Sequence, residues 1–266
     1  MLSMDKCPLC GSERTRLEHK SAGTSIRSCA ACELLYRFPQ PSDGELEELY
    51  NSHYTKEKMT NNRPGGASPE NVLRQHLDLI DRFLLPLKGK RILDYGCGAG
   101  ALGKIAKARG MDVAGVESNA HAREHLIKTG LFPVYKDAHE LSASGKRFDL
   151  IVLIQVLEHL REPWNDIGKL AGLLSPGGCI YITTINSKGL NIIVNGFHRR
   201  ELLKMEHLYW FTYKCLDALC KNAGLGRTIR LRNAVADTNQ GPALRVSQTI
   251  LGRFDLAGSI KIGVKR

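Results

Sequence analysis

The sequence has no long run of apolar residues. Its longest dense apolar stretch, residues 150–157, has eight residues and contains Gln155, whereas a helix that crosses a bilayer needs about 20. The N-terminal residues MLSMDKCPLC also lack the apolar stretch that a secretory signal requires. We therefore expect no transmembrane helix and a cytoplasmic protein.

Internal repeats and low-complexity tracts are absent as well. A chain of 266 residues, of which 42% are hydrophobic, is long enough to bury one sizeable core. We expect one main domain with a small appended module.

The chain also has no excess of acidic residues, and its formal net charge is +11 at pH 7. Residues 161–266 hold 16 of the 38 Lys and Arg residues but 7 of the 27 Asp and Glu residues, so the basic excess is mainly C-terminal. A positive field favours anionic partners such as nucleotide-linked sugars, phosphorylated small molecules or RNA. A solvated basic surface explains the same count, so charge alone selects no substrate.

Eight cysteines are present, and four of them are bunched near the N-terminus. Cys7, Cys10, Cys29 and Cys32 form the pattern C-x2-C-x18-C-x2-C, which has the spacing of a tetrahedral zinc site. Four thiolates leave no open coordination position, so this zinc would be structural. Two incidental CxxC pairs, or a redox pair, are the alternatives. We expect a zinc-ribbon module over residues 1–40.

Beyond this module the chain divides into a linker and a larger domain. Residues 41–69 are predicted to form a short charged helix, as a lid, and a turn-rich linker. From residue 70 onward helical patterns alternate with short apolar runs, which predicts βαβ units and a parallel sheet. Helices are expected at residues 101–109, 120–129, about 164–174 and 212–222. We predict a doubly wound α/β fold over residues 70–266, with a substrate-covering insertion at about 187–211.

A glycine loop follows the first strand of this domain, where open α/β sheets bind their ligands. Gly96, Gly98 and Gly100 permit a tight turn and let a ligand approach the backbone. The same letters satisfy the dinucleotide pattern G-x-G-x-x-G/A, so a nicotinamide or flavin cofactor is an alternative.

Three carboxylates bear on the choice of cofactor. Glu117 ends the second strand, where an acidic residue binds ribose hydroxyls in either cofactor class. Asp94 opens the loop, where a carboxylate would repel phosphates but suit a sulfonium or an amino group. Asp137, followed by Ala138, closes the third strand and could accept a hydrogen bond from an adenine amino group, or simply cap the next helix.

With these motifs the chain resembles the class I S-adenosylmethionine-dependent methyltransferases over about 175 residues. ILDYGCGAG matches the loop, VAGVES the ribose strand and KDA the adenine position, and FDLIVLIQVLEHL and LLSPGGCIYITTIN match the fourth and fifth strands. The resemblance implies a mostly parallel seven-stranded sheet. It also implies a set of cofactor contacts: Asp94, Gly96, Gly98 and Gly100 at the methionine end, Glu117 at the ribose, Asp137 and Ala138 at the adenine, and Gln155 beneath.

The N-terminal segment resembles the zinc-ribbon leader of bacterial methyltransferases of the glycan and natural-product type. This resemblance implies that Tyr50 and Tyr54 cover the cofactor, although an aromatic pair at this spacing also packs on a helix. A zinc ribbon before a methyltransferase domain also resembles certain ribosomal-RNA methyltransferases.

Methyl transfer requires mainly the alignment of an acceptor with the sulfonium methyl, and a base removes its proton where needed. The candidate bases are Glu158 and His159, which follow the fourth strand, and His207 in the expected insertion. Each of the two histidines could instead brace its own segment. Further candidates for substrate contact are Asn186, His198, Arg199 and Arg200.

The sequence therefore favours an S-adenosylmethionine-dependent methyltransferase with a structural zinc. Its acceptor is expected to be small or glycan-linked and anionic, with a sugar or nucleotide sugar favoured. The alternatives are an RNA methyltransferase, a non-catalytic partner protein that binds S-adenosylmethionine, and a nicotinamide oxidoreductase.

Overall fold

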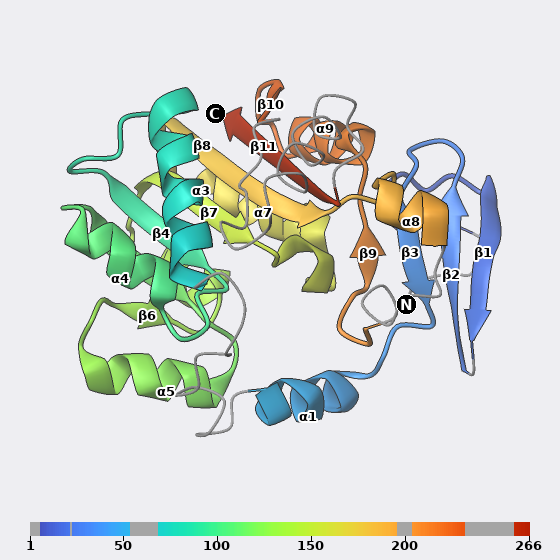
Figure 1. The fold of residues 1–266 in the computed structure, drawn as a ribbon, viewed down its shortest axis with the longest axis horizontal. Coiled ribbons are helices and arrows are strands. Elements are labelled where there is room, and N and C mark those ends of the chain that lie inside the picture. Colours follow the sequence, from blue (N-terminus) through green and yellow to red (C-terminus); the bar gives the residue numbers. More distant parts are fainter. Residues whose placement is uncertain (1–5, 22, 54–68, 196–203, 232–257) are drawn as a thin grey trace.

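The computed structural model describes residues 6–21, 23–53, 69–195, 204–231 and 258–266 (Figure 1). Its larger sheet has seven described strands, of which the last along the chain runs antiparallel to the other six. In spatial order they are β10 (Thr228–Arg230), β11 (Ser259–Lys265), β8 (Leu174–Ile185), β7 (Phe148–Ile154), β4 (Arg91–Tyr95), β5 (Asp112–Val116) and β6 (Val134–Tyr135). The predicted fold class is confirmed.

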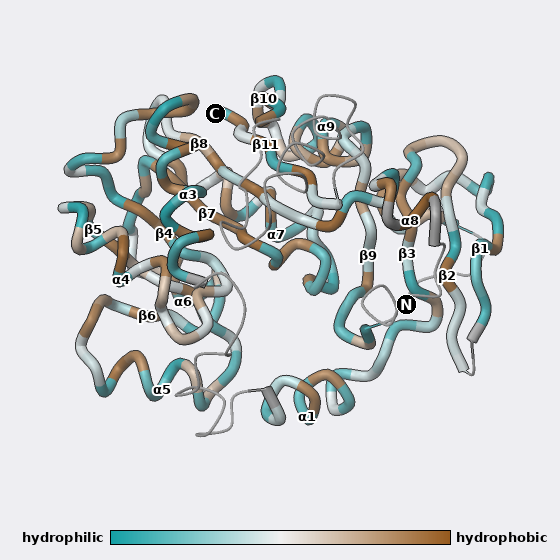
Figure 2. The backbone as a smooth tube through the Cα atoms, in the orientation of Figure 1, coloured by the Kyte–Doolittle hydropathy of each residue, from teal (hydrophilic) through white to brown (hydrophobic). Residues whose placement is uncertain are grey.

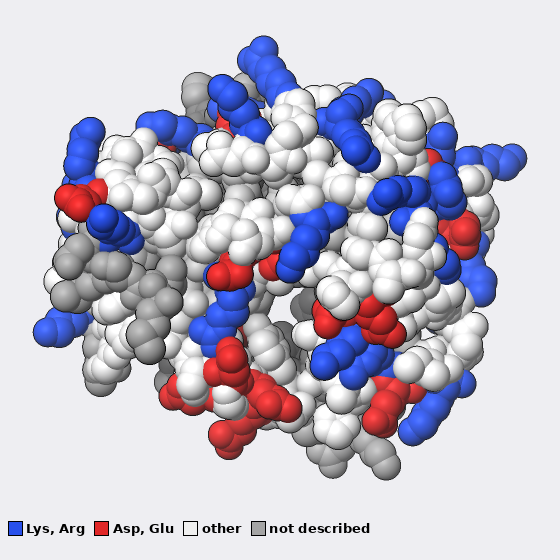
Figure 3. Space-filling view, turned by 180° about the vertical axis from the view of Figure 1, so that it is seen from behind, with Lys and Arg blue, Asp and Glu red and all other residues white. Residues whose placement is uncertain are grey.

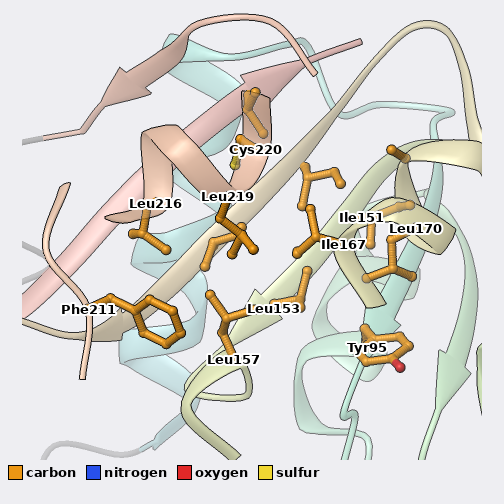
Figure 4. Packing of buried hydrophobic residues seen from close by; sticks show 14 of the residues in the cluster. Tyr95, Ile151, Leu153, Leu157, Ile167, Leu170, Phe211, Leu216, Leu219 and Cys220 are labelled. Atoms are coloured by element: carbon orange, nitrogen blue, oxygen red, sulfur yellow. The ribbon is translucent and has the colours of Figure 1, made fainter. Parts of the chain in front are cut away.

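Helices cover both faces of this sheet because alternate side chains of the buried strands point to opposite sides. In β7, Leu150 and Val152 pack in one buried cluster and Ile151 and Leu153 in the other. The first face is covered by α3 (Pro69–Phe83), α4 (Ala101–Ala108) and α5 (Ala120–Thr129). The second is covered by α6 (Ala138–Ala143), α7 (Pro163–Gly172) and α9 (Tyr213–Asn222). Figure 4 shows side chains of α7 and α9 packed beside those of β7.

Hydrophobic residues are concentrated in the central strands, whereas the helices mix hydrophobic and hydrophilic residues along their length (Figure 2). Strands buried on both faces are expected to be apolar along their length, and helices that cover a sheet need one apolar side. The elements therefore form where the period of their apolar residues predicts them. The expected helix at 120–129 matches α5 at both ends.

Two of the differences from the predicted boundaries affect the sheet. The helix expected to reach residue 174 ends at Gly172, and β8 begins at Leu174 and continues through the Ser175-Pro176-Gly177-Gly178 turn. A register shift between Phe148 and Leu150 of β7 absorbs this turn within the sheet. The expected third strand shortens to two residues because β6 lies at the edge and pairs on one side only.

The N-terminal segment forms an antiparallel meander of β1 (Thr15–Ser21), β2 (Thr24–Cys29) and β3 (Leu35–Phe38). A fourth strand, β9 (Tyr209–Trp210), joins β3 and comes from the expected substrate-covering insertion. The ribbon sheet is therefore completed by a distant part of the chain (Figure 1). Between the ribbon and the larger domain lies α1 (Asp43–His53), the predicted charged helix.

Two short helices complete the described part of the chain: η1 (Leu157–His159) directly after β7, and α8 (Leu190–Asn195) after β8. Within the described ranges, no helix is both long and apolar enough to span a membrane. The predicted linker lies mostly outside the described residues.

Candidate active site

The glycine loop follows β4 at the centre of the larger sheet. The backbone amides of Gly96 and Cys97 donate to the carbonyl of Val116 at 2.8 and 3.0 Å, which folds the loop over the end of β5. Gly96 has φ 77°, and a Cβ there would lie 2.6 Å from Cγ2 of Val156. Gly100 has φ 80°, and its Cβ would lie 2.5 Å from Cδ2 of Leu126. Glycine is required at both positions by backbone conformation and by space.

A cavity of about 370 Å³ opens beside this loop, at the carboxyl ends of β4, β5 and β7. This is the position where open α/β sheets bind ligands. Its lining residues come from the loop, from these strand ends and that of β6, from α1, from η1 and the residue after it, and from the segment before β9: Tyr50, Tyr95, Gly96, Val116, Glu117, Ser118, Asn119, Lys136, Asp137, Gln155, Val156, His159, Leu160 and Glu206.

Glu117 lines the cavity and also holds the loop. Its Oε2 accepts from the amide of Gly98 and its Oε1 from the amide of Asn119, both at 2.8 Å. Each carboxylate oxygen has a second lone pair, so these bonds leave acceptor capacity for ribose hydroxyls. The expected position of Glu117 at the end of the second strand fits the structure.

Asp94 lies in β4, one residue before the strand ends, is 6% exposed and does not line the cavity. Its Oδ2 is buried without a hydrogen-bond partner among the described residues. Burial raises the pKa of Asp94 to about 7, with a further contribution from the charge of Glu117. An unpaired buried carboxylate oxygen next to the loop fits a cationic or ammonium-bearing ligand.

Asp137 lines the cavity and caps α6. Its Oδ1 accepts from the amides of His139 and Glu140, both at 2.9 Å, and these bonds lower the pKa of Asp137. Of the two roles expected for Asp137, the described contacts show the helix cap. Its second oxygen is not used in this cap, and Ala138 is buried beneath it.

Gln155 lines the cavity in the left-handed backbone region, with φ 54°. A non-glycine residue in this region stores strain, and such residues cluster at functional sites. Its Nε2 donates to Oγ1 of Thr183 at 3.3 Å. The strain at Gln155 is not visible in the sequence, which shows an ordinary polar residue after an apolar strand.

Of the three candidate bases, His159 is the one that lines the cavity. The Tyr50 hydroxyl of α1 lies 3.1 Å from Nδ1 of His159, and the His207 ring meets the His159 ring edge-on at 5.1 Å between centroids. His207 therefore supports His159 from behind. The expected lid role of Tyr50 is consistent with its place in the lining, while Tyr54 lies outside the described residues.

Glu158 lies in the interior of the domain. It is fully buried, its Oε2 accepts from Oγ1 of Thr184 at 2.8 Å, and burial raises its pKa to about 7. Asn186 is also buried, and its Oδ1 accepts from the amide of Lys188. Neither residue lines the cavity. The candidates at 198–200 lie outside the described residues.

The four N-terminal cysteines converge. Their sulfur atoms all lie within 4.8 Å of one another, with 3.5 Å between Cys7 and Cys32 and 3.6 Å between Cys10 and Cys29. Zinc–sulfur bonds of about 2.3 Å place thiolates roughly 3.8 Å apart in a tetrahedron. These residues therefore fit a zinc ion. Cys215 of α9, which the sequence analysis left aside, donates from its sulfur to the Cys32 carbonyl at 2.9 Å.

The charges around the cavity differ from the expectation of an anionic acceptor. Its lining contains three acidic residues, Glu117, Asp137 and Glu206, and one basic residue, Lys136. Lys and Arg side chains are scattered over the face shown in Figure 3 and interspersed with acidic ones, with no continuous basic stripe. The net positive charge of the chain is therefore not concentrated at the described part of the cavity.

Comparison with known proteins matches residues 69–226 to the family described as methyltransferase domain. A ubiquinone biosynthesis O-methyltransferase of Aromatoleum aromaticum is 37% identical over 162 residues, which cover 56% of this chain and 69% of the relative. Another with the same name, from Cereibacter sphaeroides, is 36% identical over 108 residues, covering 38% of this chain and 44% of the relative. The chain spans about half the length of the curated relatives it matches.

Solved structures share the fold at low identity. The 1,6-didemethyltoxoflavin-N1-methyltransferase of Burkholderia thailandensis, solved with S-adenosylhomocysteine, has a TM-score of 0.53 at 16% identity and covers 94% of this chain and 98% of its own. The cyclase SpnF has a TM-score of 0.56 at 16% identity and covers 85% of this chain and 97% of its own. The family match excludes the nicotinamide alternative for the glycine loop. Its extent, over more than half of the residues, means that the chain belongs to the S-adenosylmethionine-dependent methyltransferases.

Proposed function

We propose that the protein transfers the methyl group of S-adenosylmethionine to a hydroxyl group of a small-molecule acceptor, and that His159 receives the hydroxyl proton. The observation that carries the proposal is the position of His159, which lines the cavity with Tyr50 at 3.1 Å from its Nδ1. The relatives named O-methyltransferases support oxygen as the methylated atom.

The cofactor would lie along the glycine loop. In this proposal the buried carboxyl of Asp94, next to the loop, attracts the cationic methionine end through its charge, Glu117 binds the ribose, and Asp137 contacts the adenine through the oxygen that its helix cap leaves available. Gly96 lines the cavity, Gly98 and Gly100 belong to the same loop with positive φ, and Gln155 supports the ligand from the end of β7. With these proposed contacts the sulfonium would lie near the carboxyl end of β4, toward the His159 side of the cavity.

The proton transfer needs one defined tautomer of His159. If Nδ1 carries a hydrogen and donates to the Tyr50 oxygen, Nε2 keeps the lone pair that accepts the acceptor's proton. The hydroxyl oxygen then attacks the methyl carbon, the bond from sulfur to methyl breaks, and S-adenosylhomocysteine is the leaving group. His207, edge-on to His159, fixes the ring plane.

The acceptor side of the cavity combines apolar and polar residues. Tyr50, Val156 and Leu160 offer an apolar surface, while Glu206 offers a carboxylate that can accept from a second donor group. A flat acceptor with more than one hydroxyl fits this wall better than a phosphorylated one, because carboxylates repel phosphates. A sugar acceptor also carries several hydroxyl groups, but the mainly acidic lining gives no reason to favour a nucleotide-linked sugar.

The zinc ion has a structural place in this proposal. Cys7, Cys10, Cys29 and Cys32 would hold it with all four coordination positions filled, so it supplies folding free energy to the ribbon and no open position for a substrate.

The test is incubation with methyl-labelled cofactor and three acceptor fractions: small phenols and catechols, sugar nucleotides, and RNA. We expect label in the phenol and catechol fraction, and its loss in His159→Ala. Label in RNA, with binding that weakens steeply as salt rises, would establish the RNA alternative. Binding of S-adenosylhomocysteine with no transfer to any fraction would establish the non-catalytic alternative.

A further inference from the structure

Arg37 of β3 ties the ribbon to the chain segment that precedes β9. The side chain is 4% exposed, and its Nε donates to the carbonyl of His207 and an Nη to that of Lys204, both at 3.0 Å. Its backbone amide also donates to the carbonyl of Leu208 at 2.9 Å. One ribbon residue therefore makes three hydrogen bonds to a segment about 170 positions away.

That segment forms part of the acceptor side of the cavity. Glu206 lies in the cavity lining, and the His207 ring packs edge-on against His159. The amide of Leu208 donates to the carbonyl of Glu158 at 2.8 Å, which joins the segment to η1 next to His159. The position of Arg37 therefore affects the groups that face an acceptor.

The other end of the ribbon is the cysteine cluster. Arg37 follows Cys32 by five positions, and the Cys29 amide donates to the Leu34 carbonyl within the turn that carries the second cysteine pair. A sheet of this size has too small a core to fold firmly by itself, so a bound zinc ion would fix the turn and the start of β3. The register of β3 in turn sets where the guanidinium lies.

The cofactor side has different supports. The loop is held by the Val116 carbonyl and the Glu117 carboxylate of the β5 end, and by the packing of Leu126 and Phe132. None of these supports comes from the ribbon. The two halves of the cavity are therefore fixed by separate parts of the fold.

We propose that Arg37 is a positioning residue through which the metal-bound ribbon holds the acceptor side of the cavity, so that loss of Arg37 or of the metal impairs methyl transfer without impairing cofactor binding. The inference rests on the proposed function for its kinetic part. Its structural part, the ordering of residues 204–210 by the ribbon, does not depend on any acceptor.

The kinetic test uses Arg37→Met, which keeps an unbranched apolar side chain as far as the position of Nε and removes the donors and the charge. We expect the kcat/KM for the acceptor to fall by about 10- to 100-fold, as for a lost charge-assisted hydrogen bond, while the Kd for S-adenosylhomocysteine changes by less than about 2-fold. Arg37→Lys, which restores one donor and the charge, should recover part of the loss. The matched control is Arg27→Met, because Arg27 bonds within the ribbon, to Oγ1 of Thr15.

The structural test is amide hydrogen exchange of the full zinc-loaded chain with and without a zinc chelator. We expect chelation and Arg37→Met each to speed exchange of the Leu208 amide, which bonds to Glu158, and to leave the Gly96 and Cys97 amides protected. Arg27→Met should leave both sets unchanged.

Two outcomes would overturn the proposal: equal losses of S-adenosylhomocysteine affinity and acceptor turnover in Arg37→Met, or Leu208 exchange that neither chelation nor Arg37→Met alters. If Arg37→Met does not fold, the exchange of the Leu208 amide in the wild-type protein with and without the chelator tests the proposal. If the wild-type protein methylates no acceptor but chelation still exposes Leu208 selectively, the proposed function fails and the structural role of the ribbon stands.

Discussion

The hydroxyl of Tyr50 lies 3.1 Å from Nδ1 of His159, although 109 positions separate the two residues. Tyr50 comes from α1, which precedes the methyltransferase domain, and His159 comes from the short helix after β7. The pair therefore closes one side of the cavity with a residue from outside the matched family domain. It also gives one ring nitrogen of His159 a fixed partner.

His159→Ala should lower kcat by about 100-fold or more, because a positioned general base contributes about 10²- to 10⁴-fold. Tyr50→Phe should lower kcat by about 10-fold, since the ring stays but its orienting partner is lost. Stopped assays at saturating cofactor measure both effects. His125→Ala, at an exposed position of α5, is the control. Wild-type turnover in His159→Ala would eliminate this histidine as the base.

Asp94→Asn should weaken S-adenosylhomocysteine binding and remove its dependence on pH near neutrality. The pKa of Asp94 is raised to about 7 by burial, so its carboxylate forms mainly between pH 6 and pH 8. A carboxylate attracts the ammonium group of the ligand, so wild-type affinity should rise with pH in this window. Calorimetric titrations at pH 6, 7 and 8 measure the affinity for S-adenosylhomocysteine. Parallel pH profiles in both proteins would exclude Asp94 from cofactor binding.

The cofactor-free protein should lose stability as pH rises through 7. Burial raises the folded-state pKa of both Asp94 and Glu158 to about 7, above the ordinary values of 3.8 and 4.5. The folded state therefore binds more protons than the unfolded chain between those limits. The stabilisation is fully present below the unfolded values and is lost as pH passes the folded ones.

Urea unfolding at pH 6 and pH 8 measures this loss, and Glu158→Gln should reduce the difference between the two free energies of unfolding. Asp149→Asn is the control, because the pKa of Asp149 is lowered by bonds to Arg91 and Ser175 and its stabilisation lies at higher pH. If the free energy of unfolding changed equally between pH 6 and pH 8 in the wild type and in Glu158→Gln, the raised pKa of the buried Glu158 carboxyl would be contradicted.

Gly96→Ala should destabilise the protein more than Gly89→Ala. Both residues have positive φ, at 77° and 74°, so both substitutions incur a backbone strain of about 1–2 kcal/mol. The Gly96 substitution adds a clash with Val156 at 2.6 Å, whereas nothing lies within 4 Å of a Cβ at Gly89. We expect an additional loss of roughly 1–3 kcal/mol from overpacking. Only Gly96→Ala should also weaken S-adenosylhomocysteine binding. Equal losses of stability in the two variants would show that the Val156 side chain moves aside without a loss of free energy.

The purified chain should bind one zinc ion, and a Cys29→Ser, Cys32→Ser double variant should bind none at equal protein concentration. Elemental analysis after dialysis gives the stoichiometry. Cys179→Ser is the control, because Cys179 lies in β8, far along the chain from the cluster, and is buried without a place in it. A zinc-free wild-type protein with intact thiols would rule out the metal.

The sequence by itself determined the cofactor half. The glycine loop, the carboxylates at the strand ends and the alternation of strands and helices are local patterns, because a positive φ and the period of apolar residues are properties of short segments. Gly96, Glu117 and Asp137 accordingly lie where the pattern predicts, on the lining of one cavity. The four cysteines likewise converge as their spacing predicts, because two CxxC turns need only one hairpin to meet.

Only the tertiary structure decided the acceptor half. Glu158 and His159 are neighbours in sequence and both are candidate bases, yet one is fully buried against Thr184 and the other lines the cavity beside Tyr50. The pairing of β9 with β3 and the bonds of Arg37 to residues 204 and 207 join segments about 170 positions apart. Such contacts depend on how the ribbon packs on the domain, and no short-range pattern of residues encodes that packing.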